Sequence, residues 1–204
     1  MNSLLQYAPR YTLNARGFLR ASNWSILTTS MVQIITDEST NAIEEFYSPT
    51  KGVLSVDQMI FDISNFMDED IASFYTLIIG TDSQIKHSNG STEVDFVTAV
   101  IVYRQQKGAR YFFRKEKQHK KPVLRDRIYT ETVMSLDLAK VLVPQIRESI
   151  SQEKYDLEIH IDVGPNGPTR EMIKEVVGMV TGSGYVAKTK PESWGASSVA
   201  DKHT

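Results

Sequence analysis

The sequence contains no cysteine and no long apolar run. Without cysteine, disulfides, thiolate nucleophiles and cysteine-based zinc sites are excluded. No apolar segment approaches the roughly 18 residues that a membrane-spanning helix needs. The remaining composition, with 41% hydrophobic and 24% charged residues, is typical of a globular protein. A chain of 204 residues therefore predicts one main domain, and its lack of cysteine is compatible with a cytoplasmic location.

Acidic residues are missing from the first 36 positions, where three arginines alternate with apolar and hydroxyl side chains. This composition is typical of a transit peptide, which would place the protein in an organelle. Two alternatives stay open: a disordered tail, or upstream sequence with Met31 nearer the true start. In each case we expect residues 1–45 to be an extension, separate from a domain over residues 46–204.

The net charge of −2 hides one strongly basic segment. Residues 104–127 carry ten basic and two acidic side chains, whereas the regions on either side of this segment are acidic. This asymmetry predicts contact with a polyanion, here nucleic acid. The alternative is a solvated loop whose lysines deter strand-edge association. The predicted phosphate-binding side chains are Arg114, Lys115, Lys117, Lys120, Lys121 and Arg125.

Hydrophobic spacing predicts an α/β domain. A helix over residues 55–67 starts with a capping box formed by Ser55 and Gln58. Three strands with short links then form a meander, and βα units follow, which favours a mixed sheet with helices on both faces. The expected strands cover residues 75–82, 94–103, 109–115, 157–163 and 185–189. The expected later helices cover residues 124–142, 169–180 and 193–203, the last two capped by Thr169 and Ser193.

Two aspartates close apolar strands in this prediction. Asp82 ends the first strand and Asp162 ends the fourth. If these strands are parallel neighbours, both carboxylates lie at the same edge of the sheet, where α/β folds hold ligands. They repel each other unless they share a cation, and a divalent ion with oxygen ligands meets that need. The alternative for each is a turn-forming Asp at a strand end.

Two helical carboxylates complete the candidate site. Glu131 shares the apolar face of its helix, although it could also be a surface residue paired with Arg127. Asp201 lies in the last helix, and an ordinary solvated position is the alternative. Four such carboxylates can hold two Mg²⁺ or Mn²⁺ ions, one for the attacking water and one for the leaving oxygen. His203, next to this group, is a candidate proton shuttle or else a mobile terminal residue.

The order of elements and several segments resemble the YkuK-like family of uncharacterised bacterial proteins, within the ribonuclease H-like superfamily. The resemblance covers about residues 46–204, and its most specific part is the stretch Asp162–Gly167. The segments that carry it are Phe46–Gly52, Gly80–Gln84, Glu131–Thr132, Glu158–Gly167 and Ala200–Thr204. It implies a five-stranded mixed sheet in the order 3-2-1-4-5. It also implies metal-ligand positions at Asp82, Glu131, Asp162 and Asp201, without implying an established reaction.

These observations favour a metal-dependent nuclease that hydrolyses RNA, an RNA–DNA hybrid or structured DNA by a two-metal mechanism. The expected cofactors are two Mg²⁺ or Mn²⁺ ions, and the expected partner is nucleic acid. The alternative is a non-catalytic nucleic-acid-binding module that keeps the ribonuclease H-like fold. Clustered carboxylates weigh against the alternative, because like charge gains nothing for binding a polyanion.

Overall fold

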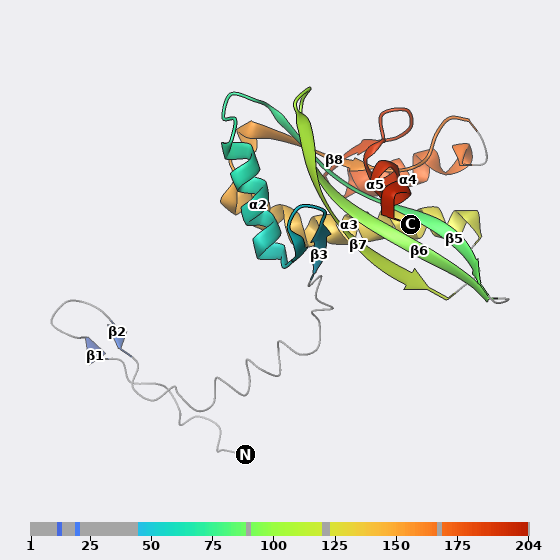
Figure 1. The fold of residues 1–204 in the computed structure, drawn as a ribbon, viewed down its shortest axis with the longest axis horizontal. Coiled ribbons are helices and arrows are strands. Elements are labelled where there is room, and N and C mark those ends of the chain that lie inside the picture. The colour runs from blue at the N-terminus through green and yellow to red at the C-terminus, as the bar shows by residue number, and fades with distance from the viewer. Residues whose placement is uncertain are drawn as a thin grey trace, which may run out of the picture. The chain divides into compact units, whose positions relative to one another are not determined.

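The computed structural model describes residues 45–88, 91–119, 123–166 and 169–203, together with two short strands near the N-terminus. The chain divides into two compact units, Met1–Ile43 and Glu44–Thr204. In the first unit, β1 (Thr12–Leu13) pairs antiparallel with β2 (Leu19–Arg20). The second unit holds the sheet and helices described below (Figure 1). Within the described part of the chain, every helix is too short or too polar to cross a membrane.

A mixed sheet of seven strands forms the centre of the second unit. Its order is β4-β3-β7-β6-β5-β8-β9, so the five predicted strands lie in the expected order 3-2-1-4-5. The prediction of five strands is wrong, because a hairpin before the first helix adds two more at the β7 edge. The strands are β3 (Phe46–Ser48), β4 (Gly52–Leu54), β5 (Tyr75–Ser88), β6 (Ser91–Arg104), β7 (Gly108–Gln118), β8 (Tyr155–His160) and β9 (Val186–Lys188).

Four α-helices lie in the described residues of this unit. The capping box at the first of them is confirmed, because the Ser55 hydroxyl accepts from the Gln58 amide and the Gln58 side chain accepts from the Ser55 amide. The helices are α2 (Val56–Asp68), α3 (Leu124–Ser149), α4 (Ile173–Gly182) and α5 (Gly195–His203), with short 3₁₀ turns at Gln152–Lys154 and Arg170–Met172.

Two of the predicted helix caps are wrong. The Thr169 hydroxyl turns back to the Gly164 backbone, at 3.3 Å from its nitrogen, and the chain passes through a 3₁₀ turn before α4 begins. Ser193 precedes the start of α5 by two residues, and its hydroxyl has no hydrogen-bond partner among the described residues. The sequence cue for a cap was present at both positions, but α4 begins at Ile173 and α5 at Gly195.

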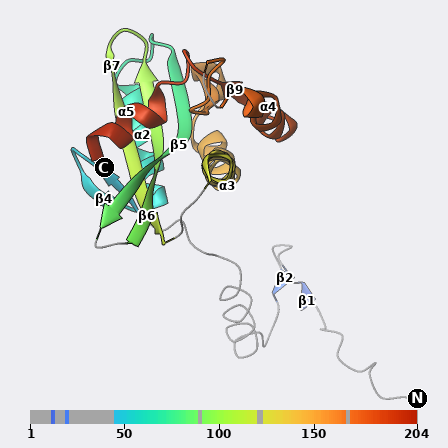
Figure 2. The ribbon, with the colours of Figure 1, turned by 90° about the vertical axis from the view of Figure 1, so that its right-hand side faces the viewer.

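Helices cover both faces of the sheet, and the alternation along β5 shows how. The Thr81 side chain accepts a hydrogen bond of 2.9 Å from Ser135 on α3, so this residue points to the α3 face. Its neighbour Gly80 points to the other face, where a Cβ would lie 2.9 Å from the Cβ of Ala196 in α5. Figure 2 shows α5 lying across the sheet on the side opposite to α2, which contacts α3. Gly80 therefore allows α5 to approach the central strand closely.

Candidate metal and nucleic-acid site

Asp82 lies within the central strand, because β5 continues to Ser88 as a ladder with β6. The prediction that Asp82 ends the strand is therefore wrong. Its side chain has the same parity as Gly80, so it points to the α5 face. Burial raises the pKa of Asp82, and the charge of Asp162 raises it further, while the Ser83 amide that donates to Oδ1 at 2.8 Å opposes the rise.

Asp162 follows the neighbouring parallel strand, two residues beyond the last residue of β8. Its Oδ1 lies 2.7 Å from the ammonium of Lys190. Backbone hydrogen bonds hold the two residues of this pair together. The Ile161 amide donates to the Lys188 carbonyl oxygen, and the Lys190 amide donates to the Val163 carbonyl oxygen. These two bonds extend the contact between the β8 and β9 chains past the ends of both strands. Lys190 is thereby held alongside Asp162.

Glu131 is 4% exposed, so the alternative of a surface pair with Arg127 is wrong. One carboxylate oxygen accepts a hydrogen bond of 2.6 Å from the Ser83 hydroxyl. Burial raises the pKa of Glu131 to about 8; the bond from Ser83 opposes this rise and the charge of Asp82 adds to it. Because Ser83 follows Asp82 on the strand, the two side chains point to opposite faces. Glu131 thus approaches the site from the α3 side.

Asp201 and His203 lie on α5, on the same side of the sheet as Asp82. Asp201 is exposed, and its charge contributes to the raised pKa of Asp82. The His203 ring stacks on Phe113 with centroids 4.0 Å apart, and its Nε2 lies 3.0 Å from the Tyr111 hydroxyl. Burial lowers the pKa of His203. For a role in proton transfer, the imidazole would have to leave the Tyr111 hydroxyl and contact the substrate instead.

The donor set of these four carboxylates is all oxygen, which fits Mg²⁺ or Mn²⁺. Their charges act on one another, and a cation is favoured among them: the pKa of Lys190 is raised first by Asp162 and then by Asp82 and Asp201. In the residues that the structure describes, however, no three His, Asp or Glu side chains converge closely enough to hold a metal ion. The Lys190 ammonium pairs with the Asp162 carboxylate, and the Glu131 carboxylate accepts a hydrogen bond from the Ser83 hydroxyl.

The predicted phosphate-binding residues fall into three groups. Arg114 points to the α3 face and pairs with Glu116 at 3.0 Å, and Arg125 pairs with Glu175 at 2.8 Å. Lys115 and Lys117 are exposed, and Lys115 lies in the same cross-strand row as Asp82, through Val97. Two further predicted residues lie outside the described residues, namely Lys120 and Lys121. Among the predicted residues that the structure describes, Lys115 and Lys117 are therefore the exposed lysines on the Asp82 face.

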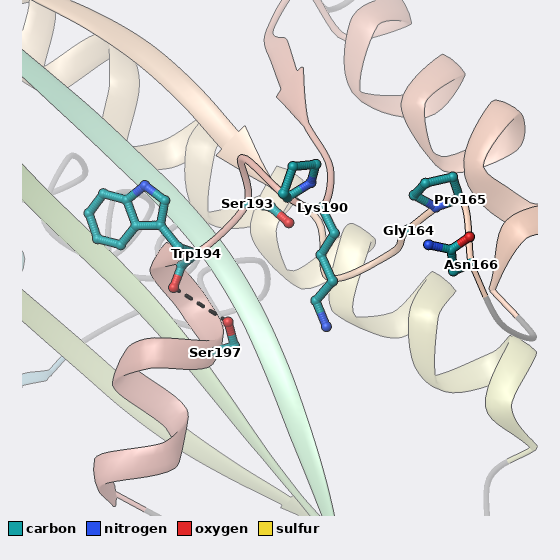
Figure 3. A pocket seen from close by; sticks show the side chains of 8 residues that line it. Gly164, Pro165, Asn166, Lys190, Ser193, Trp194 and Ser197 are labelled. Atoms are coloured by element: carbon teal, nitrogen blue, oxygen red, sulfur yellow. Dashed lines mark hydrogen bonds between the residues drawn. The ribbon is translucent and has the colours of Figure 1, made fainter.

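Sequence reasoning missed Lys190, Ser83 and a pocket beside Asp162. The pocket has a volume of about 580 Å³ and lies between the loop after β8 and the segment that leads into α5 (Figure 3). Ser83 could have been found as the neighbour of Asp82, but Lys190 stands in no recognisable motif and reaches the site only through tertiary contact. The residues that line the pocket are Gly164, Pro165, Asn166, Lys190, Pro191, Ser193, Trp194 and Ser197.

Comparison with known proteins identifies the family. The family described as Ribonuclease H-like matches residues 58–204 of the chain. The chain belongs to the ribonuclease H-like family. It is also similar to the uncharacterized protein YkuK of Bacillus subtilis (strain 168), with 30% identity over 173 residues that cover 78% of this chain and 96% of the relative. No solved structure matches the chain significantly. The resemblance predicted from the sequence is confirmed, and the ribonuclease H-like match includes all four candidate carboxylates.

Proposed function

We propose that this ribonuclease H-like protein is a metal-dependent nuclease. It would hydrolyse phosphodiester bonds in RNA, an RNA–DNA hybrid or structured DNA, with Mg²⁺ or Mn²⁺ held by Asp82, Glu131, Asp162 and Asp201. The observation that carries the proposal is the gathering of charge from four distant segments: Asp162 and Asp201 add to the raised pKa of Asp82, and Asp82 and Asp162 add to the raised pKa of Glu131. Such repulsion is costly unless a cation is bound. The family of the chain supports the same reading.

The residues of the site would have separate roles in this reaction. Asp82 lies on β5 and Asp162 follows the neighbouring parallel strand β8, and the two would supply the central ligands. Ser83 would hold the Glu131 carboxylate in place through its short hydrogen bond. Lys115 and Lys117 would hold the phosphate backbone on the same face. When bound, the divalent ions would supply a more acidic water and positive charge beside the leaving oxygen.

A cleavage assay with Asp82→Asn tests the proposal. Wild-type protein is expected to cut at least one of the three substrate types with Mn²⁺ or Mg²⁺. The variant keeps the shape of the side chain but removes its charge, so the rate should fall by more than about 100-fold. Asp137→Asn is the matched control, because Asp137 is exposed on α3 and pairs with Lys140. Full activity in Asp82→Asn would overturn the assignment of the ligands.

Direct metal binding gives a second readout. Mn²⁺ should raise the melting temperature of the wild type and of Asp137→Asn, because a ligand that binds the folded state stabilises it. The same addition should leave Asp82→Asn unchanged. An equal rise in all three proteins would place the metal elsewhere.

Two observations favour a second candidate, a non-catalytic nucleic-acid-binding module. Lys190 already neutralises Asp162, and no three acids converge in the described residues. A binding module predicts salt-sensitive association with nucleic acid and no turnover with any divalent ion. The two candidates therefore separate in the same assay.

A further inference from the structure

The pocket beside Asp162 contains a buried hydroxyl that the fold does not use. Ser193 is 5% exposed, and its Oγ is shielded from solvent without a hydrogen-bond partner in the described residues. The nearby helix does not explain it, because α5 begins at Gly195. A buried polar group without a partner costs free energy, and native proteins seldom leave one without a reason. A ligand in the pocket would give this hydroxyl its missing partner.

Other polar groups lie around the same space. Figure 3 shows the Lys190 side chain extending between the two segments that form the pocket, while the Trp194 indole points away from Lys190. Asn166 and the Ser197 hydroxyl border the pocket from opposite segments. Ammonium, amide and hydroxyl groups all donate hydrogen bonds, and the amide and hydroxyls also accept them. This set suits a ligand that carries both phosphate oxygens and sugar hydroxyls.

The pocket is continuous with the carboxylate site. Gly164 follows Asp162 by two residues, and Ser197 lies one helical turn before Asp201. Lys190 belongs to both, because it lines the pocket and its Nζ lies 2.7 Å from Asp162. The volume of about 580 Å³ is within the range of small-ligand sites and is far larger than an ion requires. A chain bound across the carboxylates would therefore bring its next unit into this pocket.

We propose that this pocket binds the sugar and phosphate of the nucleotide adjacent to the bond that the carboxylates address. This inference rests on the proposed nuclease function. Lys190 contacts the phosphate, and Ser193 and Asn166 hydrogen-bond to the sugar–phosphate unit. The pocket thereby adds a contact to the strand itself, independent of the metal ions.

Binding to a fluorescein-labelled single-stranded oligonucleotide, measured by anisotropy in EDTA, tests the pocket without cleavage. Ser193→Ala should weaken binding by about tenfold, because it removes a hydrogen bond to a charged or hydroxyl group. Ser198→Ala is the matched control, since Ser198 is exposed on the helix that follows Ser193 and does not line the pocket. Ser193→Ala should unfold at the same or a higher temperature than the wild type, because it deletes an unpaired buried hydroxyl.

Salt dependence tests the role of Lys190. Lys190→Gln should lower the slope of log affinity against log salt by about one, as expected when one phosphate contact is lost. Lys140→Gln, an exposed lysine on α3, should leave the slope unchanged. RNA and DNA oligonucleotides form the two arms. A larger effect of Ser193→Ala on RNA assigns its hydroxyl to the 2′-OH, and an equal effect assigns it to the phosphate.

Equal binding by Ser193→Ala and Ser198→Ala would overturn the pocket proposal. If the wild type still cleaved with Mn²⁺ in that case, the nuclease proposal would stand alone. Weakened binding by Ser193→Ala in a protein that never cleaves would support the pocket and overturn the nuclease proposal instead.

Discussion

Acidic residues gather at two places in this molecule, and the fold treats them in opposite ways. At one place, which we call the arginine-paired corner, α2 and the turn after it meet β6 and β7. Arg110 binds Asp62 at 2.9 Å and Glu69 at 2.6 Å, and Lys107 binds Asp70 at 2.7 Å. The hydrogen bonds from Lys107 and Ser73 lower the pKa of Asp70 to about 2. Each of these three acids is paired with a cation, and Arg110 pairs with two of them.

The carboxylate site has the same residue types and the opposite balance. Burial raises the pKa values of Asp82 and Glu131, and neighbouring acids raise them further. In the described residues, the ion pair at these four carboxylates is that of Lys190 with Asp162. The comparison teaches that this fold can neutralise acids with arginine and lysine where they serve structure. The surplus of negative charge at the carboxylate site is therefore consistent with a cation that comes from solution.

The largest effect expected from this difference is on stability against pH in the absence of metal. Because the raised pKa of about 8 means that folded Glu131 holds its proton more tightly than the unfolded chain, its contribution is fully present below pH about 4.5. It is lost as the pH rises toward 8, at a slope of at most about 1.4 kcal/mol per pH unit. Denaturant unfolding in EDTA from pH 5 to pH 8.5 measures this slope. Glu131→Gln should flatten it, and an unchanged slope in that variant would contradict the assignment.

The arginine-paired corner can be broken directly with Asp62→Asn. This change removes the charge that Arg110 neutralises, and Asp62 is 8% exposed, so the free energy of unfolding should fall by about 1–3 kcal/mol. Mn²⁺ binding, followed by calorimetry, should stay as in the wild type. A loss of metal binding would show that the two acidic regions are coupled and would end the contrast.

The smallest expected effect concerns the lysine–aspartate ion pair, which both acidic regions contain. Lys190 competes with a metal ion for Asp162, so Lys190→Gln should tighten Mn²⁺ binding by about fivefold, equivalent to ~1 kcal/mol for an exposed ion pair. Lys107→Gln breaks a pair of equal length at the arginine-paired corner and should leave Mn²⁺ binding unchanged. Unchanged binding in Lys190→Gln would mean that this lysine is a structural partner like Lys107.

Local patterns predicted the elements whose cues are local. The capping box predicted the start of α2, and the spacing of apolar residues predicted β6, β7 and β8 within about three residues. It also predicted where α3 and β5 begin, but α3 continues to Ser149 and β5 to Ser88, well past their expected ends. The hairpin of β3 and β4 was missed because its strands have three residues each and flank a stretch with proline and glycine that is typical of a turn. The end of β5, from Ser83 to Ser88, was missed because Ile85 is its one apolar side chain, and its pairing with the β6 backbone is not visible in the sequence.

The sequence predicted the acids of the candidate site but not the side chains that surround them. Asp82 and Asp162 could be chosen because each interrupts or follows an apolar strand, and the parallel pairing of β5 with β8 brings these two segments side by side. Lys190 and Ser193 could not be chosen, because their roles depend on the return of the chain after β9. Ser83 could have been chosen as the neighbour of Asp82, but its partner Glu131 lies 48 residues away in the sequence. Charge distribution and hydrophobic periodicity in the sequence do not predict contacts between such distant residues.

The close approach of α5 to the central strand has a last consequence for the carboxylates. At Gly80 an added methyl group would lie 2.9 Å from both the Ala196 Cβ and the His160 carbonyl oxygen, so main chain and helix touch with nothing between them. Asp82 is two residues further along that strand, and Asp201 is five residues further along that helix. The distance between these two acids therefore depends on the absence of a side chain at position 80. Gly80→Ala would push α5 away from β5 and so increase the separation of Asp82 and Asp201.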